Sequence, residues 1–211
     1  MSKIKQKRDA QVTKAKILTE SRLLFSKKGF DATTIDDIAK ESGVNKALIY
    51  YYFKNKSGLY SSVMSELFDV IYMEVLEARD GCESVVDELS SFVFTYANYA
   101  EKNPYFPALL LRELSDSGAH LPDMMFASMR RLFALLGDIL ERGEREGVFK
   151  KSISMVVHFM IIGSLSLMIT TKPLRQKAME IDKDVDTSPE FSIDVIAKYV
   201  FESIKISLEV K

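Results

Sequence analysis

A short stretch of the chain carries side chains that could contact DNA. It runs from Asn45 to Phe53 (NKALIYYYF), and Asn45 is suited to cap a helix there. At about 100° per residue, such a helix turns Ile49 and Phe53 to one side. The other side carries a small residue and two phenols: Ala47, Tyr50 and Tyr51. This outward set suits a DNA groove, although an exposed aromatic cluster also suits a protein interface or a partly buried seam.

A second short helix is predicted directly before this one. Thr34 is placed to cap it, and Asp37 three residues later completes a capping box. Gly43 marks its end, because glycine tolerates the left-handed conformation in which helices stop. Two helices joined by a short turn with glycine form a helix-turn-helix, whose second helix enters the major groove of DNA. The stretch from Thr33 to Lys56 is therefore predicted to be such a motif.

These residues also carry a resemblance to a known family. The run GVNKALIYYYFKNK from Gly43 to Lys56, preceded by Thr33-Thr34 and by Lys28-Gly29-Phe30, resembles the DNA-binding domain of the TetR family of bacterial transcriptional regulators. The match covers about the first quarter of the chain. It implies an all-α protein with an N-terminal three-helix DNA-binding domain and a larger C-terminal helical domain that binds an effector and dimerises. The remaining sequence matches only in length and helical layout, so the identity of the effector is not carried over.

The resemblance also implies roles for individual residues. Four of them are expected to hold phosphates: Thr34, Tyr50, Tyr52 and Lys56. Four others are expected at base edges or the nearby backbone: Asn45, Lys46, Ala47 and Tyr51. In the major groove, Lys46 suits guanine and Ala47 suits a thymine methyl. Leu48 departs from the family pattern, which often has a hydroxyl residue there, and this leaves its role open between apolar contact and packing.

The charge of the chain is unevenly divided. Residues 1–60 carry 13 Lys and Arg against 6 Asp and Glu, a net +7, whereas residues 61–211 carry a net −8. A basic segment that coincides with the predicted DNA reader favours nucleic acid over a merely solvated charged face. Cys82 is the single cysteine, and we see no signal-peptide pattern at the N-terminus. A cytoplasmic protein without an intrachain disulfide is therefore expected.

The rest of the chain is predicted to be helical throughout. Residues 2–16 are strongly basic, and their early part is expected to be a flexible arm that contacts DNA. Helices are expected at residues 13–28, 57–79, 83–102, 104–117, 122–146, 152–171 and 190–209. The helix at 57–79 has apolar residues every four positions and is long enough to couple a DNA-binding domain to the rest. We place the domain boundary after residue 56, giving a DNA-binding domain at 1–56 and an effector-binding and dimerisation domain at 57–211.

The last two predicted helices are strongly apolar. Residues 152–171 contain no formal charge if His158 is neutral, and their length approaches that of a membrane span. His158, Gly163 and several hydroxyl residues interrupt this run, so we interpret it as a helix packed on its own core and on a partner. Because of these interruptions no membrane contact is expected, and the resemblance implies a homodimer through the helices at 152–171 and 190–209. Residues 172–189 between them are polar and expected to be mobile. The alternative that the preceding helix continues into the start of this stretch stays open.

Aromatic residues and methionines recur along the middle helices. A flexible apolar pocket for a small effector would use such side chains. The candidates are Phe92, Tyr96, Tyr99, Phe106, Met125, Met129, Phe133 and Phe159. For any one of them, ordinary core packing at helical spacing is the favoured alternative. His120 and His158 are isolated in the sequence, so neither a metal site nor a cofactor is predicted.

These features favour a sequence-specific transcriptional regulator. The leading hypothesis is a homodimeric repressor that binds a palindromic operator and is released by a small hydrophobic effector. The alternative is a DNA-binding protein of the same fold that acts architecturally or through a protein partner, without a small-molecule response. An enzyme is disfavoured, because the sequence shows no catalytic triad, metal or phosphate-loop pattern.

Overall fold

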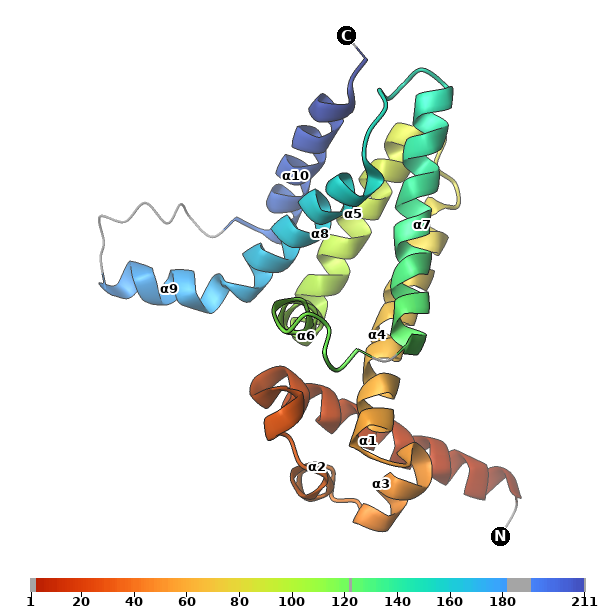
Figure 1. The fold of residues 1–211 in the computed structure, drawn as a ribbon, viewed down its shortest axis with the longest axis vertical. Helices are drawn as coiled ribbons and strands as arrows, with labels where there is room; N and C mark the ends of the chain where they lie inside the picture. The colour runs from red at the N-terminus through yellow and green to blue at the C-terminus, as the bar shows by residue number, and fades with distance from the viewer. Residues whose placement is uncertain (1–2, 122, 182–190, 211) are drawn as a thin grey trace. The chain divides into compact units, whose positions relative to one another are not determined.

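The structure is a computed structural model that describes residues 3–121, 123–181 and 191–210. Within these residues the chain forms ten helices (Figure 1). In order they are α1 (Lys3–Ala32), α2 (Ile35–Ser42), α3 (Lys46–Phe53), α4 (Lys56–Arg79), α5 (Val85–Lys102), α6 (Tyr105–Ser115), α7 (Asp123–Arg145), α8 (Ser154–Thr170), α9 (Lys172–Ile181) and α10 (Ile193–Leu208). The predicted all-α class is confirmed, and the bounds of the predicted helices agree to within a few residues after α1.

Helix α1 differs from its prediction at both ends. It begins at Lys3, so the segment expected to be a flexible arm is helical where the structure describes it. At the other end Gly29 leaves the helical conformation with φ 83° and ψ 175°, and a further short helical stretch reaches Ala32. A positive φ of this kind suits glycine, which has no Cβ. The predicted end of the helix at residue 28 therefore coincides with a break at Gly29, but the element continues to Ala32.

The described chain divides into two compact units. The head unit comprises Met1–Phe68 and Leu109–Ala127, and the body unit comprises Asp69–Ala108 and Ser128–Lys211. These units are defined by packing and are not the same as the functional division expected after residue 56, which remains a prediction. Helix α4 contributes its first part to the head unit and its second part to the body unit.

The core of the head unit joins α1, α2, α3 and the start of α4. Ile17, Phe25, Ile38 and Ile49 are at most 1% exposed, and each comes from the apolar side of its helix. Tyr60 of α4 completes this core, with its ring in edge contact with Phe25 at 4.8 Å between centroids. Burial of such side chains is the main source of stability for helices as short as α2 and α3.

The segment from Leu109 to Ala127 belongs to the head unit although it lies far along the chain. Tyr60 donates a 2.5 Å hydrogen bond to Oε1 of Glu113, which is only 2% exposed. His120 places its ring 4.5 Å from that of Phe30, and its Nε2 lies 3.4 Å from Oδ1 of Asp31. The end of α6 and the segment that follows it therefore contribute polar and aromatic contacts to the three-helix head, which the sequence did not predict.

The body unit is built around α5, α8 and α10, with the second half of α4 and most of α7. Helix α5 buries one side over its whole length, including Leu89, Phe92 and Tyr96. The phenol of Tyr96 lies 2.8 Å from the hydroxyl of Ser166 in α8, and both groups are buried. Burial raises the pKa of Tyr96, so its phenol is neutral and joins α5 to α8 by a hydrogen bond.

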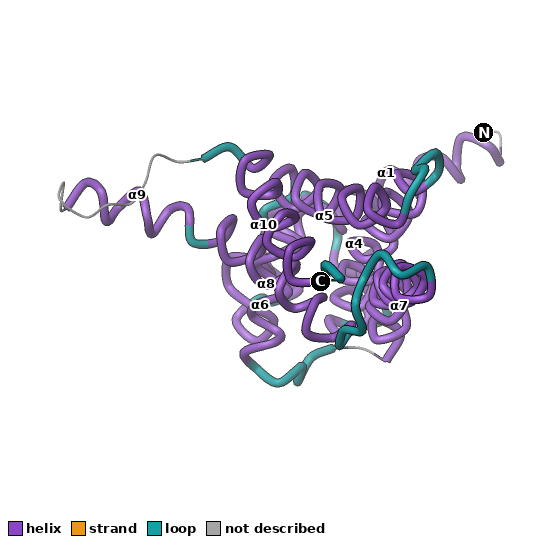
Figure 2. Tube along the Cα trace, turned by 90° about the horizontal axis from the view of Figure 1, so that it is seen from above, coloured by secondary structure: helices purple, strands orange, loops and turns teal. Residues whose placement is uncertain are grey.

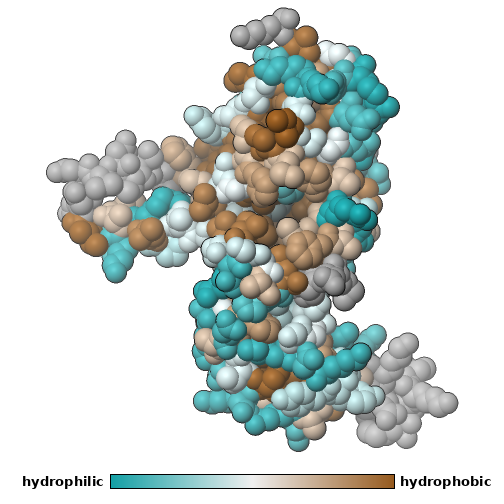
Figure 3. Space-filling view, viewed as in Figure 1, coloured by the Kyte–Doolittle hydropathy of each residue, from teal (hydrophilic) through white to brown (hydrophobic). Residues whose placement is uncertain are grey.

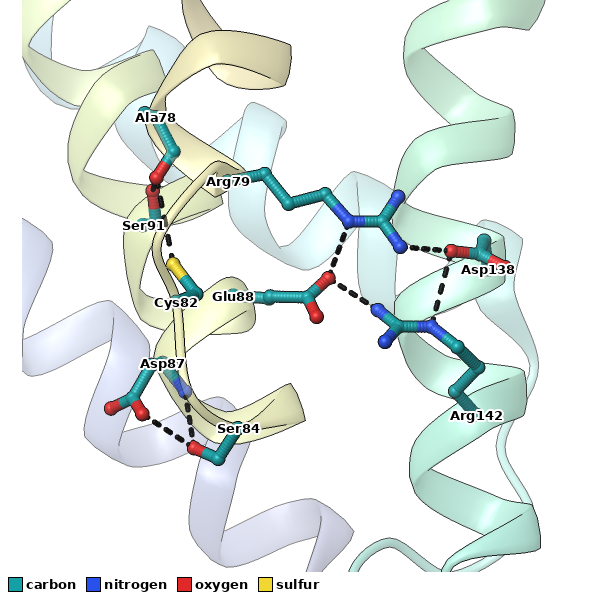
Figure 4. Close-up of polar contacts among 9 residues, drawn as sticks. All are labelled: Ala78, Arg79, Cys82, Ser84, Asp87, Glu88, Ser91, Asp138 and Arg142. Carbon is teal, nitrogen blue, oxygen red and sulfur yellow. Dashed lines mark hydrogen bonds and ion pairs between the residues drawn. The ribbon is translucent and has the colours of Figure 1, made fainter.

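A charged cluster holds three helix ends of the body unit together (Figure 4). Glu88 at the start of α5 is 8% exposed and pairs with Arg79 at 2.6 Å and with Arg142 of α7. Asp138 completes the cluster, with its Oδ2 2.5 Å from Arg79. The hydrogen bond to Glu88 is the main reason that the pKa of Arg142 is raised. Every charge in the cluster has an opposite partner, which is the condition for tolerating a buried carboxylate.

Helices α8 and α10 are apolar on two sides. In α8, Val157, Ile161 and Leu165 are at most 5% exposed, whereas Val156 and Leu167 are 51% and 53% exposed. In α10, one face is largely buried in the body unit; its most buried members are Ala197, Ile204 and Leu208. The opposite side of α10 also presents apolar residues to solvent: Val195, Tyr199 and Ile206.

The polar stretch expected between these two helices begins with a helix of its own. Helix α9 follows α8 after one residue, and none of its side chains is buried. The part of the mobile stretch that was expected at residues 182–189 lies outside the described residues.

Candidate nucleic-acid interface

The start of α2 is fixed by the predicted capping box. The hydroxyl of Thr34 accepts a hydrogen bond from the backbone N–H of Asp37 at 3.1 Å. The carboxylate of Asp37 accepts one in return from the backbone N–H of Thr34 at 3.3 Å. The hydrogen bond from Lys28 and then the one from Thr34 lower the pKa of Asp37. Two otherwise unsatisfied N–H groups are thus capped, and α2 begins where the sequence predicts.

The turn between α2 and α3 follows the predicted chemistry as well. Gly43 has φ 60° and ψ 29°, a left-handed conformation, and its N–H bonds the carbonyl of Lys40 at 3.2 Å. The side chain of Asn45 then accepts a 2.8 Å hydrogen bond from the N–H of Ala47. The helix stop and the next helix cap lie within three residues, and this holds α2 and α3 close together as a helix-turn-helix requires.

Helix α3 presents two different faces. Ile49 and Phe53 are 1% and 4% exposed and pack into the head core. Tyr50 and Tyr51 are 50% and 78% exposed, and Ala47 is also exposed. The predicted inward and outward sets are confirmed as buried and exposed. A short helix that turns a small residue and two phenols outward has the composition of a major-groove reader.

Lys46 meets an acid that the sequence analysis did not single out. Its ammonium pairs with Oδ1 of Asp36 in the first turn of α2, and the two side chains are 55% and 67% exposed. Asp36 lies ten positions before Lys46, so only the fold of the two helices brings the charges together. An exposed pair of this kind contributes about 0–1 kcal/mol and is readily exchanged for other partners. The ammonium of Lys46 therefore lies at the exposed edge of the helix pair beside a carboxylate.

Lys56 uses its ammonium inside the head unit. Its Nζ donates hydrogen bonds to the carbonyls of Phe30 at 3.0 Å and Asp31 at 3.3 Å. It also lies 4.3 Å from the ring centroid of Phe30, a cation–π distance. These contacts cap the carbonyl end of α1. The phosphate contact predicted for Lys56 would compete with these internal bonds and remains a prediction.

Two more residues of α3 are placed between surface and core. Tyr52 is half-buried, and its ring meets those of Tyr51 at 5.2 Å and Phe53 at 6.3 Å. Leu48, the departure from the family pattern, is 41% exposed. Leu48 is thus an apolar residue on the rim of the exposed face.

Basic residues of α1 lie beside this helix pair. Lys14 places its Nζ 5.8 Å from the ring centroid of Phe53, at the C-terminal end of α3. The Nζ of Lys16 comes within 3.4 Å of the point where a Cβ of Gly43 would stand, next to the turn. Both belonged to the segment expected to contribute charge, but a helix carries them to defined places. The ammonium groups of Lys14 and Lys16 therefore lie near the exposed face of the helix pair but are not part of that face.

The residues predicted to line an effector pocket are not brought together as one set. Phe92, Tyr96, Tyr99 and Phe106 are at most 3% exposed and lie in the body core. Met129 and Phe133 of α7 are half-buried, and Phe159 of α8 is 53% exposed. The side chain of Met125 lies outside the described residues. The first four therefore follow the core alternative, whereas Met129, Phe133 and Phe159 remain candidates at a partly open surface.

His158 lies beside those remaining candidates. Its ring contacts Phe133 at 5.3 Å and Phe159 at 6.0 Å between centroids. Its Nδ1 is buried and has no hydrogen-bond partner among the described residues. Burial lowers the pKa of His158 to about 4, so the imidazole is neutral at pH 7. A neutral ring with an unused nitrogen between two aromatics suits a polar group on an otherwise apolar ligand.

A separate groove of about 840 Å³ opens in the body unit between α4, α5 and the start of α10. Tyr99 is the one predicted pocket residue in its lining, which also includes Glu74, Glu77, Asp194 and Lys102. This lining is more polar than the apolar pocket that the sequence predicts. Among the described residues, no single helix is long and apolar enough to cross a membrane; α8 and α9 pass that test only together, across a bend of 50°.

Comparison with known proteins places both parts of the chain. Residues 17–63 match the family described as bacterial regulatory proteins, tetR family, and residues 86–186 match the tetracyclin repressor-like C-terminal domain. The chain is 27% identical over 197 residues to the probable HTH-type transcriptional regulator YttP of Bacillus subtilis (strain 168), covering 92% of this chain and 91% of that protein. It is 35% identical over 83 residues to IcaR, a negative regulator of the biofilm operon icaADBC in Staphylococcus aureus, covering 39% of this chain and 45% of IcaR.

Solved structures share the fold at lower sequence identity. The regulator FadR from Bacillus subtilis in complex with stearoyl-CoA aligns with a TM-score of 0.74 at 18% identity, covering 92% of this chain and 99% of that one. A TetR family transcription regulator from Marinobacter aquaeolei VT8 gives a TM-score of 0.74 at 16% identity, covering 98% and 100%. These structures support the fold, and the two family models and the relative YttP, together with the capped helix-turn-helix, show that the chain is a DNA-binding transcriptional regulator of the TetR family.

Proposed function

We propose that this regulator is a homodimeric repressor that binds a palindromic operator through α3 and releases it when a small hydrophobic effector binds the body. The observation that carries this proposal is the two-faced α3, which buries Ile49 and Phe53 and exposes Tyr50 and Tyr51. Its output is the occupancy of DNA rather than a chemical reaction, and it acts in the cytoplasm, where its operator is.

The DNA contacts follow from the exposed face of the helix pair. Base edges, or the backbone beside them, are met by four residues: Asn45, Lys46, Ala47 and Tyr51. Phosphates are held by Thr34, Tyr50 and Tyr52, with Lys56 able to join only if it leaves the carbonyls of Phe30 and Asp31. In a symmetric dimer the two α3 helices meet half-sites about 34–36 Å apart or a multiple of that, which implies a palindrome.

The dimer forms through the exposed sides of α8 and α10. On α8, Val156, Met160 and Leu167 share one stripe and are 41–53% exposed. Gly163 lies in the same stripe, and a Cβ added to it would meet nothing within 4 Å. Glycine inside a helix costs about 1 kcal/mol relative to alanine, and a single subunit shows no steric reason for it here. A second α8 that approaches closely at Gly163 would supply that reason.

The effector is a small hydrophobic molecule that binds near α7 and α8. Phe133, Phe159 and the unused Nδ1 of His158 offer apolar walls and one polar group. The stearoyl-CoA held by the similarly folded FadR makes a long-chain acyl-CoA the first ligand to test. To move the DNA-competent state from 99:1 to 1:99, differential binding of about 5.5 kcal/mol is needed, which two sites per dimer can share.

Footprinting and release together test this function. The purified chain should protect an intergenic site with two symmetric half-sites, and a hydrophobic effector should remove the protection. Stearoyl-CoA is the first probe, with free CoA as the matched control that lacks the apolar chain. A chain that protects no discrete site would contradict the regulator mechanism. Protection that persists with every effector tried, in a dimer, would instead favour the DNA-binding protein without a small-molecule response.

A further inference from the structure

Helix α9 leaves α8 in a defined direction. The two helices are separated by Thr171 and meet at a bend of 50°. Arg175 holds this bend, because its Nη1 donates to the carbonyl of Met168 at 2.9 Å and to the hydroxyl of Thr171 at 2.6 Å. The last turn of α8 is thereby tied to the first turn of α9, and the position of α9 in the body unit is set by specific contacts.

The two most exposed apolar side chains of α9 lie in a stripe on one side of the helix, whereas Met179, 38% exposed, lies about 140° away. Leu174 and Ile181 are 68% and 76% exposed, and Ala178 lies between them at helical spacing. None of the ten residues of α9 is buried, and in two views the helix projects away from the packed helices of the body unit (Figures 1 and 2). An isolated helix of this length is marginal in water. Contacts between α9 and another molecule would therefore stabilise this helix.

A second copy of the chain is the occupant that best fits this stripe. The exposed apolar residues of α8 and α9 follow one another along the same connected pair of helices, and apolar atoms are visible over both in the space-filling view (Figure 3). If the exposed side of α8 faces its copy, the helix that continues past its end is carried along the surface of that copy. In a dimer with two-fold symmetry this contact occurs twice, because α9 of each subunit packs on the other subunit.

We propose that α9 is an interchain arm, whose Leu174–Ala178–Ile181 stripe packs against the second subunit of the dimer. This extends the proposed contact of α8 and α10 and rests on it. Each arm covers apolar surface that a single subunit leaves in water, and the pair of arms adds to the dimer without altering either head unit.

The first experiment compares two substitutions on opposite sides of α9 in the full-length protein. Leu174→Asp places a charge on the stripe, and Gln176→Asp places one about 200° away on the same helix. Sedimentation equilibrium should give a dimer Kd raised about 30-fold or more by Leu174→Asp and less than about threefold by Gln176→Asp, since each side chain counts twice in a symmetric dimer. Leu174 is exposed in the single subunit, so the folded content by circular dichroism should not change.

A second measurement needs no substitution. Hydrogen exchange of the α9 amides in the wild-type protein should be slow well above the dimer Kd and fast well below it. Exchange that does not depend on protein concentration would overturn the arm, and so would an unchanged Kd in Leu174→Asp. Protection that appears only with vesicles of anionic lipid would assign the stripe to a membrane surface instead.

Val156→Asp on α8 separates this proposal from the dimer on which it rests. If Val156→Asp weakens the dimer and Leu174→Asp does not, the α8 contact stands and the arm is wrong. If neither substitution changes the oligomeric state, both the proposed dimer contact and the arm are wrong. Loss of dimer in both variants, with Gln176→Asp unaffected, supports both.

Discussion

Tyr60 and Glu113 are 53 positions apart in the chain, yet their side chains share a 2.5 Å hydrogen bond inside the head unit. The second carboxylate oxygen of Glu113 is buried and has no hydrogen-bond partner among the described residues. Burial first, and then the hydrogen bond to Glu113, raise the pKa of Tyr60. The phenol therefore stays protonated as the donor that satisfies a buried carboxyl group.

Removing this donor should destabilise the head unit. Tyr60→Phe keeps the ring but removes the hydrogen bond to the buried carboxyl of Glu113, at a cost of about 1–3 kcal/mol in urea unfolding at pH 8. An unfolded tyrosine ionises near pH 10, whereas the folded Tyr60 does not, so its contribution to stability is lost as the pH rises above about 10. The wild type should lose more stability than Tyr60→Phe between pH 8 and 10.5. Tyr51→Phe, at a 78% exposed position outside the proposed dimer contact, is the control and should change neither value.

A substitution of Lys56 tests whether its side chain stabilises the head unit or binds a DNA phosphate. Its ammonium lies on two carbonyls and the ring of Phe30, so Lys56→Ala should lower the free energy of unfolding by about 1–3 kcal/mol. If these contacts persist on DNA, the salt dependence of operator binding should be unchanged. A slope reduced by about 0.9 in a folded variant would show that Lys56 does reach a phosphate, as the sequence predicts.

The pair of Lys46 and Asp36 should influence how strongly the head binds DNA of any sequence. Asp36→Asn removes a carboxylate from the exposed edge of the helix pair, so random-sequence DNA should bind about 3- to 10-fold more tightly at low salt. Lys46→Ala should weaken operator binding. Glu41→Gln makes the same charge change about 140° away on α2 and should have little effect. Equal tightening by Glu41→Gln and Asp36→Asn would show only a net-charge effect.

Local sequence signals were sufficient to predict the helix-turn-helix. The capping box of Thr34 and Asp37, the stop at Gly43 and the cap at Asn45 depend on neighbours within four positions, and the structure has all of them. The apolar spacing of α4 likewise predicts which of its faces is buried, because a helix repeats its faces regularly. The helix predicted at residues 13–28 likewise ends beside the observed break at Gly29.

Contacts between distant segments could not be predicted in this way. Glu113 meets Tyr60, and Asp36 meets Lys46, only after the helices have packed. The aromatic residues of α5 illustrate the same limit: Phe92 and Tyr96 have the composition of a pocket wall, but helix packing seals them in the core. Lys56 was assigned to phosphate by resemblance, and nothing in its sequence neighbourhood indicates the carbonyls that it caps.

Tyr51 should separate DNA binding from stability. It is 78% exposed on α3, so Tyr51→Ala should leave the thermal unfolding midpoint nearly unchanged. Operator affinity in a gel-shift or fluorescence assay should fall about 10-fold or more, as for the loss of one good base contact. Ile49→Ala, on the buried face of the same helix, should instead cost about 2–5 kcal/mol of stability. Unchanged operator affinity in Tyr51→Ala would remove this residue from the DNA contact.

His158 should make the protein sensitive to acid. Burial lowers its pKa to about 4, against an ordinary value of about 6.5, so below pH 6.5 the unfolded chain takes up a proton that the folded chain does not. Stability should therefore fall as the pH drops from about 6.5 to 4, by about 3 kcal/mol from this group. His158→Leu cannot take up this proton and also removes the unpartnered Nδ1, so it should lose correspondingly less in urea unfolding between pH 7 and 4.5. Both proteins keep His120 and every carboxylate, so the difference between their pH profiles isolates His158. Parallel profiles would mean that the imidazole is protonated in the folded protein and that the space between Phe133 and Phe159 is open to water.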